Sequence, residues 1–203
     1  MKKKALYLLP LLIMIAFILF PSGAANLYIR IYFDEVEGEE CTLYYATDTV
    51  NVFCIEQHLS SGISQEERMA EFCLAPYLDG HITGFRLDLP NVEQLLSIKN
   101  ITVSSGGVIK RQYNPCDFFA DDNIASTNNI DSITLATASG RTYIGTLPEE
   151  SYLVLSDGLC RQITDCYSHF RLTRAAVCVF LLAGFYLARR KLFRDDPAVS
   201  CRE

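Results

Sequence analysis

Aromatic and polar side chains gather between Tyr113 and Asn123 in the combination that sugar binding requires. Exposed rings stack on the faces of sugars, while amide and carboxylate groups bond their hydroxyls. The stretch is also the longest interval between predicted strands, and long loops in compact domains are often functional. The sequence therefore predicts a ligand-binding loop whose candidate residues are Tyr113, Asn114, Asp117, Phe118, Phe119, Asp121 and Asp122.

Two other interpretations of this loop stay open. Phe118 and Phe119 can fold back and cap one end of the domain instead of meeting a ligand. The carboxylates can gather around calcium with Asn123, as loops of sandwich modules often do, although their spacing is not that of an EF-hand. A solvated loop is the simpler interpretation of the carboxylates, so we expect neither a metal nor a cofactor.

The residues that carry most enzyme chemistry are scattered. His58, His81 and His169 each fall in a predicted loop or flank, without a neighbour that would complete a nucleophile–base pair. The chain has no G-x-S-x-G motif, no C-x-x-C pair and no Cys/His cluster of the kind that binds zinc. The sequence predicts no catalytic residue, and we expect a protein that is not an enzyme.

Two apolar segments enclose the rest of the chain. Ala5–Phe20 follows three lysines, and Ala175–Ala188 runs directly into Arg189, Arg190 and Lys191. Basic clusters of this kind favour the cytoplasmic side of a membrane. The sequence therefore predicts a cell-membrane protein whose central region lies outside the cytoplasm and whose C-terminal tail lies inside it.

The two segments differ in what they predict. The first fits either a cleavable signal peptide, with small residues at Ser22–Ala25, or a retained anchor. The second is short for a span, but its apolar side chains cover every face of a helix, which favours spanning over lying at the interface. The expected segments are a signal peptide or anchor (1–25), an extracytoplasmic domain (26–170), a transmembrane helix (171–191) and a cytoplasmic tail (192–203).

The charge of the central region excludes one class of partner. The whole chain has a net charge of −6, but residues 26–170 hold 8 Lys+Arg against 21 Asp+Glu, a net charge of −13. A domain this acidic will not bind nucleic acid and is repelled by anionic lipid and anionic polymer.

Six of the eight cysteines fall in the predicted extracytoplasmic domain. An even number in an oxidising compartment indicates disulfides, with 15 possible connectivities. Spacing makes Cys160–Cys166 the easiest local pair. Buried thiols on strands are the alternative for Cys41, Cys54 and Cys73, and an anaerobic host would leave all of them reduced.

Short runs with two-residue alternation, separated by Gly-containing turns, repeat through the central region. They predict an all-β domain, an antiparallel sandwich or jelly roll. In one run Phe85, Leu87 and Leu89 face the predicted core, while Arg86 and Asp88 share the other face and lie close enough to pair. The predicted strands are 27–33, 41–46, 52–55, 70–74, 82–89, 95–103, 108–113, 130–137, 142–146 and 152–155.

Several strand motifs follow one another in an order that resembles a known family of modules. A tyrosine-rich strand at Tyr44 and Tyr45 precedes the Arg86–Pro90 strand and the Ile98-Lys99-Asn100-Ile101 strand. Over roughly residues 40–157 the chain resembles the extracytoplasmic β-sandwich modules attached to bacterial membrane glycosyltransferases and related cell-envelope polysaccharide proteins. It departs from that pattern by placing Leu89 between Asp88 and Pro90, and it has no multi-span glycosyltransferase portion.

The resemblance implies a galactose-binding-like or jelly-roll accessory fold without catalysis. The function expected on this basis is a membrane-anchored module for envelope glycan assembly or recognition, with a membrane glycosyltransferase as a possible partner. Two alternatives remain: a structural or signalling subunit of a larger membrane protein, and a hydrolase or transferase that acts on envelope polymer.

Overall fold

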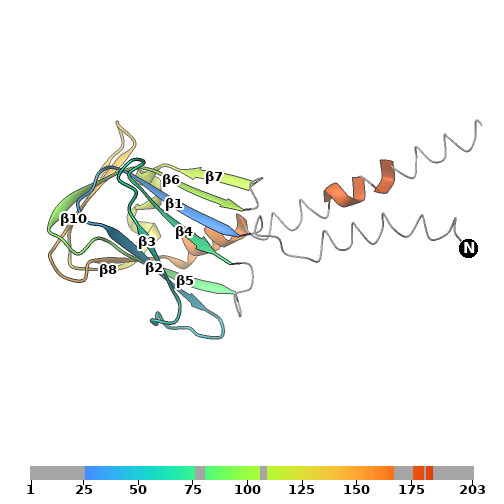
Figure 1. Ribbon diagram of the computed structural model, residues 1–203, viewed down its shortest axis with the longest axis horizontal. Coiled ribbons are helices and arrows are strands. Elements are labelled where there is room, and N and C mark those ends of the chain that lie inside the picture. Colours follow the sequence, from blue (N-terminus) through green and yellow to red (C-terminus); the bar gives the residue numbers. More distant parts are fainter. Residues whose placement is uncertain (1–25, 76–80, 106–108, 167–175, 181, 185–203) are drawn as a thin grey trace, which may run out of the picture. The chain divides into compact units, whose positions relative to one another are not determined.

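The chain divides into two compact units, and the one described below is Ser22–Ser168. The predicted N-terminal segment (1–25) and the predicted tail (192–203) lie outside the described residues. No helix in the described ranges is long and apolar enough to cross a bilayer. The computed structural model describes residues 26–75, 81–105, 109–166, 176–180 and 182–184 (Figure 1).

The described strands form two antiparallel sheets, which confirms the all-β prediction. The first sheet has the order β4-β1-β6-β10-β9, and β7 pairs with the second half of β6; the second sheet has the order β3-β2-β5-β11-β8. The strands are β1 (Leu27–Glu35), β2 (Glu40–Thr47), β3 (His58–Gly62), β4 (Met69–Leu74), β5 (Ile82–Asp88), β6 (Gln94–Ser105), β7 (Ile109–Tyr113), β8 (Ile124–Asn128), β9 (Ile130–Ala136), β10 (Arg141–Thr146) and β11 (Tyr152–Leu155).

Strands that follow one another in the sequence occupy the same position in the two sheets. The pairs are β4 and β3, β1 and β2, β6 and β5, β10 and β11, and β9 and β8, in the order of the sheets. The chain therefore passes from one sheet to the other at every corner between the members of a pair. Each pair of consecutive strands thus contributes one strand to each sheet, and we call this arrangement a double ribbon.

All five of these corners lie at the same end of the sandwich. They are the β1–β2, β3–β4, β5–β6, β8–β9 and β10–β11 connections. The β8–β9 corner is a single residue, Asn129, with a positive φ of 51°. At Gly38, where φ is +99°, an added Cβ would lie 2.6 Å from a Pro90 carbon, so only glycine fits this close approach. We call this the corner end.

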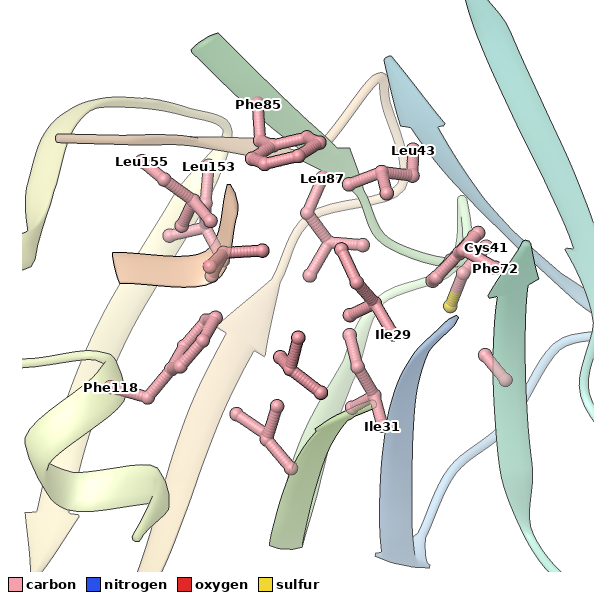
Figure 2. Packing of buried hydrophobic residues seen from close by; sticks show 14 of the residues in the cluster. Ile29, Ile31, Cys41, Leu43, Phe72, Phe85, Leu87, Phe118, Leu153 and Leu155 are labelled. Carbon is pink, nitrogen blue, oxygen red and sulfur yellow. The ribbon is translucent and has the colours of Figure 1, made fainter. Parts of the chain in front are cut away.

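Alternate residues of the strands fill the core between the sheets (Figure 2). In β1 every second residue from Leu27 to Phe33 is buried, as a strand covered on one face requires. Phe85, Leu87 and Leu89 lie on the core side of β5, as predicted. The largest fully buried side chains include Phe33, Phe72, Phe85, Phe118 and Phe119.

Several segments differ from the sequence prediction. β3 and β8 form where no strand was predicted. Residues 52–55, predicted as a strand, belong to the loop between β2 and β3. Residues 157–166 are helical, and this helix was not predicted. Its buried face contributes Leu159, Cys160, Ile163 and Cys166 to the core. The spacing of these residues is helical, but the short predicted strand just before them obscured the change of period.

The described cysteines are free thiols, and four of those in the sandwich are buried: Cys41, Cys116, Cys160 and Cys166. The predicted Cys160–Cys166 pair is not formed, because both residues lie on one helix. Six helical residues span about 9 Å, more than the roughly 7 Å that a disulfide bridges. Burial raises the pKa of Cys41 to about 12 and that of Cys160 to about 11.

Replacing Leu87 with alanine should lower the free energy of unfolding by about 2–5 kcal/mol, because the side chain is buried between the sheets and its removal leaves a cavity. Denaturant titration of the purified protein measures the loss. Ser126→Ala on the exposed face of the same sheet is the control and should change stability by about 0.5 kcal/mol or less. Equal losses would contradict this assignment of the sheet faces.

The buried Cys41 thiol should make the fold sensitive to alkali. A thiol ionises at an ordinary pKa of 9.0 when unfolded but at about 12 in the fold, so its contribution is complete below pH 9 and is lost as pH rises toward 12. At pH 10 the loss is about 1.4 kcal/mol. In Cys41→Ala, the fall in unfolding free energy between pH 8 and pH 10 should be smaller by that amount. Parallel pH profiles would refute the prediction.

Candidate functional site

Most of the apolar residues in the predicted binding loop pack into the core, so the loop has mainly a structural role. Asn114 caps the short helix α2 (Pro115–Phe118), and its side-chain oxygen accepts a hydrogen bond from the Cys116 amide at 2.9 Å. Phe118 and Phe119 are 2% and 0% exposed, and the Phe118 ring contacts Tyr113 edge-on at 5.5 Å. These two phenylalanines therefore pack in the core and offer no ring face to a ligand, as the capping interpretation required.

The acidic residues of the same segment are exposed at the surface. Asp117 is exposed at the helix, and Asp121 and Asp122 are exposed in the 3-10 turn η2 (Asp121–Asn123). Asn123 donates its side-chain amide to the Asp117 carbonyl at 2.7 Å. Among the described residues, no group of His, Cys, Asp or Glu is arranged to hold a metal.

A different set of polar and aromatic side chains comes together on the outer face of the second sheet. The register pairs Tyr44 with Arg86 across β2 and β5, and Asp88 with Tyr152 across β5 and β11. Leu43, Leu87 and Leu153, which alternate with these residues, are buried. Because successive side chains of a strand point to opposite faces, the polar set lies on the outside.

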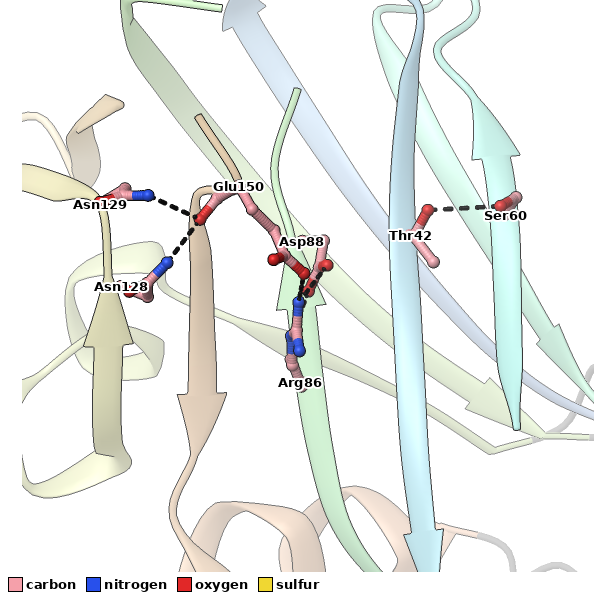
Figure 3. A network of polar contacts seen from close by, with 7 residues as sticks. All are labelled: Thr42, Ser60, Arg86, Asp88, Asn128, Asn129 and Glu150. Carbon is pink, nitrogen blue, oxygen red and sulfur yellow. Dashed lines mark hydrogen bonds and ion pairs between the residues drawn. The ribbon is translucent and has the colours of Figure 1, made fainter. Parts of the chain in front are cut away.

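Arg86 is the centre of this set (Figure 3). Its Nε and Nη2 donate to the two oxygens of Asp88, each at 2.7 Å, and Nη2 also donates to Glu150. The guanidinium carbon lies 3.7 Å from the centre of the Tyr152 ring and 5.0 Å from that of Tyr44. The predicted Arg86–Asp88 pair is therefore present, and it joins three strands rather than one.

The electrostatics of the cluster follow from its partial burial. The side chains of Arg86 and Asp88 are 17% and 15% exposed. Burial lowers the pKa of Arg86, but the hydrogen bonds and charges of Asp88 and Glu150 outweigh it and raise that pKa. Burial raises the pKa of Asp88, Arg86 opposes this shift, and the charge of Glu150 adds to it. Two carboxylates share one cation, so the cluster is negative.

A groove of about 410 Å³ opens beside the cluster at the corner end. Its walls come from the β1–β2, β5–β6 and β10–β11 corners. Four carboxylates lie along it, together with the Thr42 hydroxyl, which is 3.3 Å from that of Ser60. The lining residues are Gly38, Glu39, Glu40, Thr42, Asp88, Leu89, Pro90, Asn91, Val92, Glu150 and Ser151.

This groove is suited to a ligand rich in hydroxyl groups. Its carboxylates are acceptors for sugar hydroxyls, and the stack of Tyr44, Arg86 and Tyr152 adds flat surface next to it. A second arginine–carboxylate pair, Arg30 with Glu71, lies on the outer face of the first sheet. That pair is more exposed, with side-chain exposures of 30% and 38%.

The sequence did not predict Tyr44, Tyr152 or Glu150 as site residues. They lie about 40 to 65 positions from Arg86 and reach it only through the pairing of β2, β5 and β11 and through the β10–β11 corner. The one available signal was the clean alternation around Arg86 and Asp88. This alternation placed Arg86 and Asp88 on one face of the strand, but it could not identify the residues of other strands that lie next to them.

Comparison of the chain with protein-family models, with curated proteins and with solved structures finds no match.

Replacing Arg86 with alanine should lower the free energy of unfolding by about 1.5–3 kcal/mol, because Asp88 keeps its charge while half-buried and loses both bonds. Arg30→Ala, at the more exposed pair, should lower it by less than about 1 kcal/mol. Arg86→Lys should restore only part of the loss, since an ammonium cannot bond both carboxylate oxygens in one plane.

Chemical denaturation of the three variants tests this expectation. The double variant Arg86→Ala/Asp88→Asn should recover part of the loss, because no unpaired charge remains. Equal destabilisation by Arg86→Ala and Arg30→Ala would mean that Arg86 is an ordinary surface residue.

Proposed function

We propose that this protein is a membrane-anchored, extracytoplasmic accessory module that recognises cell-envelope glycan. The observation that carries the proposal is the corner-end groove with the Arg86 cluster beside it. The groove combines carboxylate acceptors with an aromatic and guanidinium surface, which are the groups that recognise a hydroxylated ligand. It lies on a rigid sheet and on corners held by backbone hydrogen bonds, so it is formed before a ligand arrives.

The topology supports the same proposal. Consecutive strands occupy equivalent positions in the two sheets, which is the double-ribbon wrapping of a jelly roll. This arrangement agrees with a galactose-binding-like accessory fold. The basic residues next to the two apolar segments support anchoring with the domain outside the cytoplasm.

The charge of the groove narrows the class of glycan. Glu39, Glu40, Asp88 and Glu150 line it, and Arg86 neutralises at most one of them. A phosphate- or carboxylate-bearing polymer would be repelled. The ligand class that fits is a neutral or amine-bearing oligosaccharide.

Binding of full-length protein in detergent to arrayed envelope glycans tests the proposal. The wild type should retain neutral or amine-bearing glycans and not anionic ones. Glu40→Ala/Glu150→Ala should weaken retention about tenfold or more, the effect of losing roughly 1.4 kcal/mol of binding free energy.

Glu66→Ala/Glu67→Ala is the matched control. It removes the same number of carboxylates from the exposed β3–β4 connection, outside the groove, and should leave retention unchanged. If both double variants lose binding equally, the groove is not the site. If the wild type retains no glycan of any class, the recognition function is wrong.

A further inference from the structure

The loop between β2 and β3, residues 48–57, exposes several large apolar side chains. Val50, Val52 and Ile55 are 38%, 61% and 73% exposed. They lie within six residues of one another, and exposed apolar side chains grouped in this way mark interaction surfaces.

The exposure of these three side chains does not result from a flexible loop, because hydrogen bonds hold the backbone. The Thr47 hydroxyl accepts a hydrogen bond from the Val50 amide at 3.1 Å, and the Thr47 amide donates to the Val50 carbonyl at 3.0 Å. Asp48 and His81 are joined by two bonds: the Asp48 amide to the His81 carbonyl at 2.9 Å, and the His81 amide to the Asp48 carboxylate at 2.8 Å. The first half of the loop is thus tied to the start of β5.

Other residues of the same loop are partly covered. Phe53 packs over β5 so closely that a Cβ added at Gly84 would lie 3.3 Å from its ring. The Tyr45 amide donates to the Gln57 carbonyl at 3.0 Å and closes the base of the loop. The Phe53 ring therefore lies against the outer face of the sheet, while Val52 and Ile55, on either side of it in the sequence, are exposed to solvent. The loop presents its aliphatic side chains in a fixed conformation.

The position of the loop indicates what covers these side chains. Leu27, where the chain enters the sandwich, pairs with Leu74 and with Ser105. Thr47 pairs with Ile82, the residue that begins β5 after the β4–β5 connection. The loop therefore starts at the end of the sandwich where the chain enters, opposite the corner end. Figure 1 shows it in teal beyond the end of β2.

The last described strand and the helix that follows it also run toward this end. The helix at residues 157–166 lies against β7, where Arg111 donates to the Gln162 carbonyl at 3.1 Å. β11 runs from Tyr152, which pairs with Asp88 at the corner end, to Leu155, so the chain enters this helix while running away from the corner end. In the sequence, the apolar segment Ala5–Phe20 ends seven residues before Leu27, and Ala175–Ala188 begins nine residues after Cys166.

We infer that the β2–β3 loop inserts Val50, Val52 and Ile55 into the interface of a zwitterionic lipid bilayer, and so gives the domain a third attachment to the membrane. The inference rests on the membrane anchoring in the proposed function. Aliphatic side chains at a bilayer surface bury their area among the headgroups and upper acyl chains. Anionic lipid would repel Asp48, Glu56 and the acidic domain as a whole. The bilayer that fits this loop therefore has no net charge.

A tryptophan reporter tests the inference directly, because the chain contains no tryptophan. Ile55→Trp in the full-length protein is placed in nanodiscs of phosphatidylcholine, with and without brominated acyl chains. Bromine near the interface should quench the emission from position 55. Leu95→Trp is the matched control: Leu95 is 58% exposed but lies near the corner end, and its reporter should not be quenched.

Two further arms separate the possible outcomes. Quenching at position 55 should fall when phosphatidylglycerol replaces phosphatidylcholine. In Val50→Ser/Val52→Ser/Ile55→Trp, which removes the neighbouring aliphatic groups, quenching should fall in phosphatidylcholine as well. Equal melting temperatures for the variants would show that each is folded.

The results distinguish this inference from the proposed function. Protein that stays in the nanodiscs without quenching at position 55 would overturn the loop insertion and leave the anchoring in place. A blue-shifted emission without bromine quenching would mean that another protein surface, such as a second copy, covers the loop. Protein that does not remain with the nanodiscs at all would overturn both the anchoring and the insertion.

Discussion

One cation organises the outer face of the second sheet. Arg86 lies among two carboxylates and two aromatic rings that come from β2, β5, β11 and the β10–β11 corner. In a region with a net charge of −13, carboxylates brought together without such a partner would repel one another. The guanidinium can bond two carboxylates and stack on a ring at the same time, which no other side chain can do. The shape of the groove beside it depends on this arrangement.

Much of the fold was predictable because strands have a simple period. The alternation in β1 and β5 identified the buried face of each strand, and glycine-containing turns separated most of the elements. What alternation cannot supply is the partner of each strand. The pairing of β1 with β6, or of β10 with β6, depends on burial summed over the whole core. Residues 52–55 show the other limit, since a short apolar run has the same composition in an exposed loop as in a strand.

The candidate site was harder to predict for a related reason. Phe118 and Phe119 occur beside polar residues, so their composition suggested a binding surface. In the fold they fill the core, because the N-cap at Asn114 turns the chain inward at that point. Conversely, Tyr44 and Tyr152 sit in ordinary strands, and only the register places both beside Arg86. A site assembled across a sheet leaves almost no local trace in the sequence.

The double-ribbon topology also has a consequence for how the chain folds as it is made. The partners of β1 are β4 and β6, and those of β2 are β3 and β5, so Leu27 meets its second neighbour only when Ser105 has been synthesised. β5 in turn needs β11 on its open edge, near the end of the domain. Synthesis proceeds from the N-terminus, and contacts this distant in sequence form slowly. The first strands therefore keep unpaired edges and uncovered apolar faces until almost the entire domain has been synthesised.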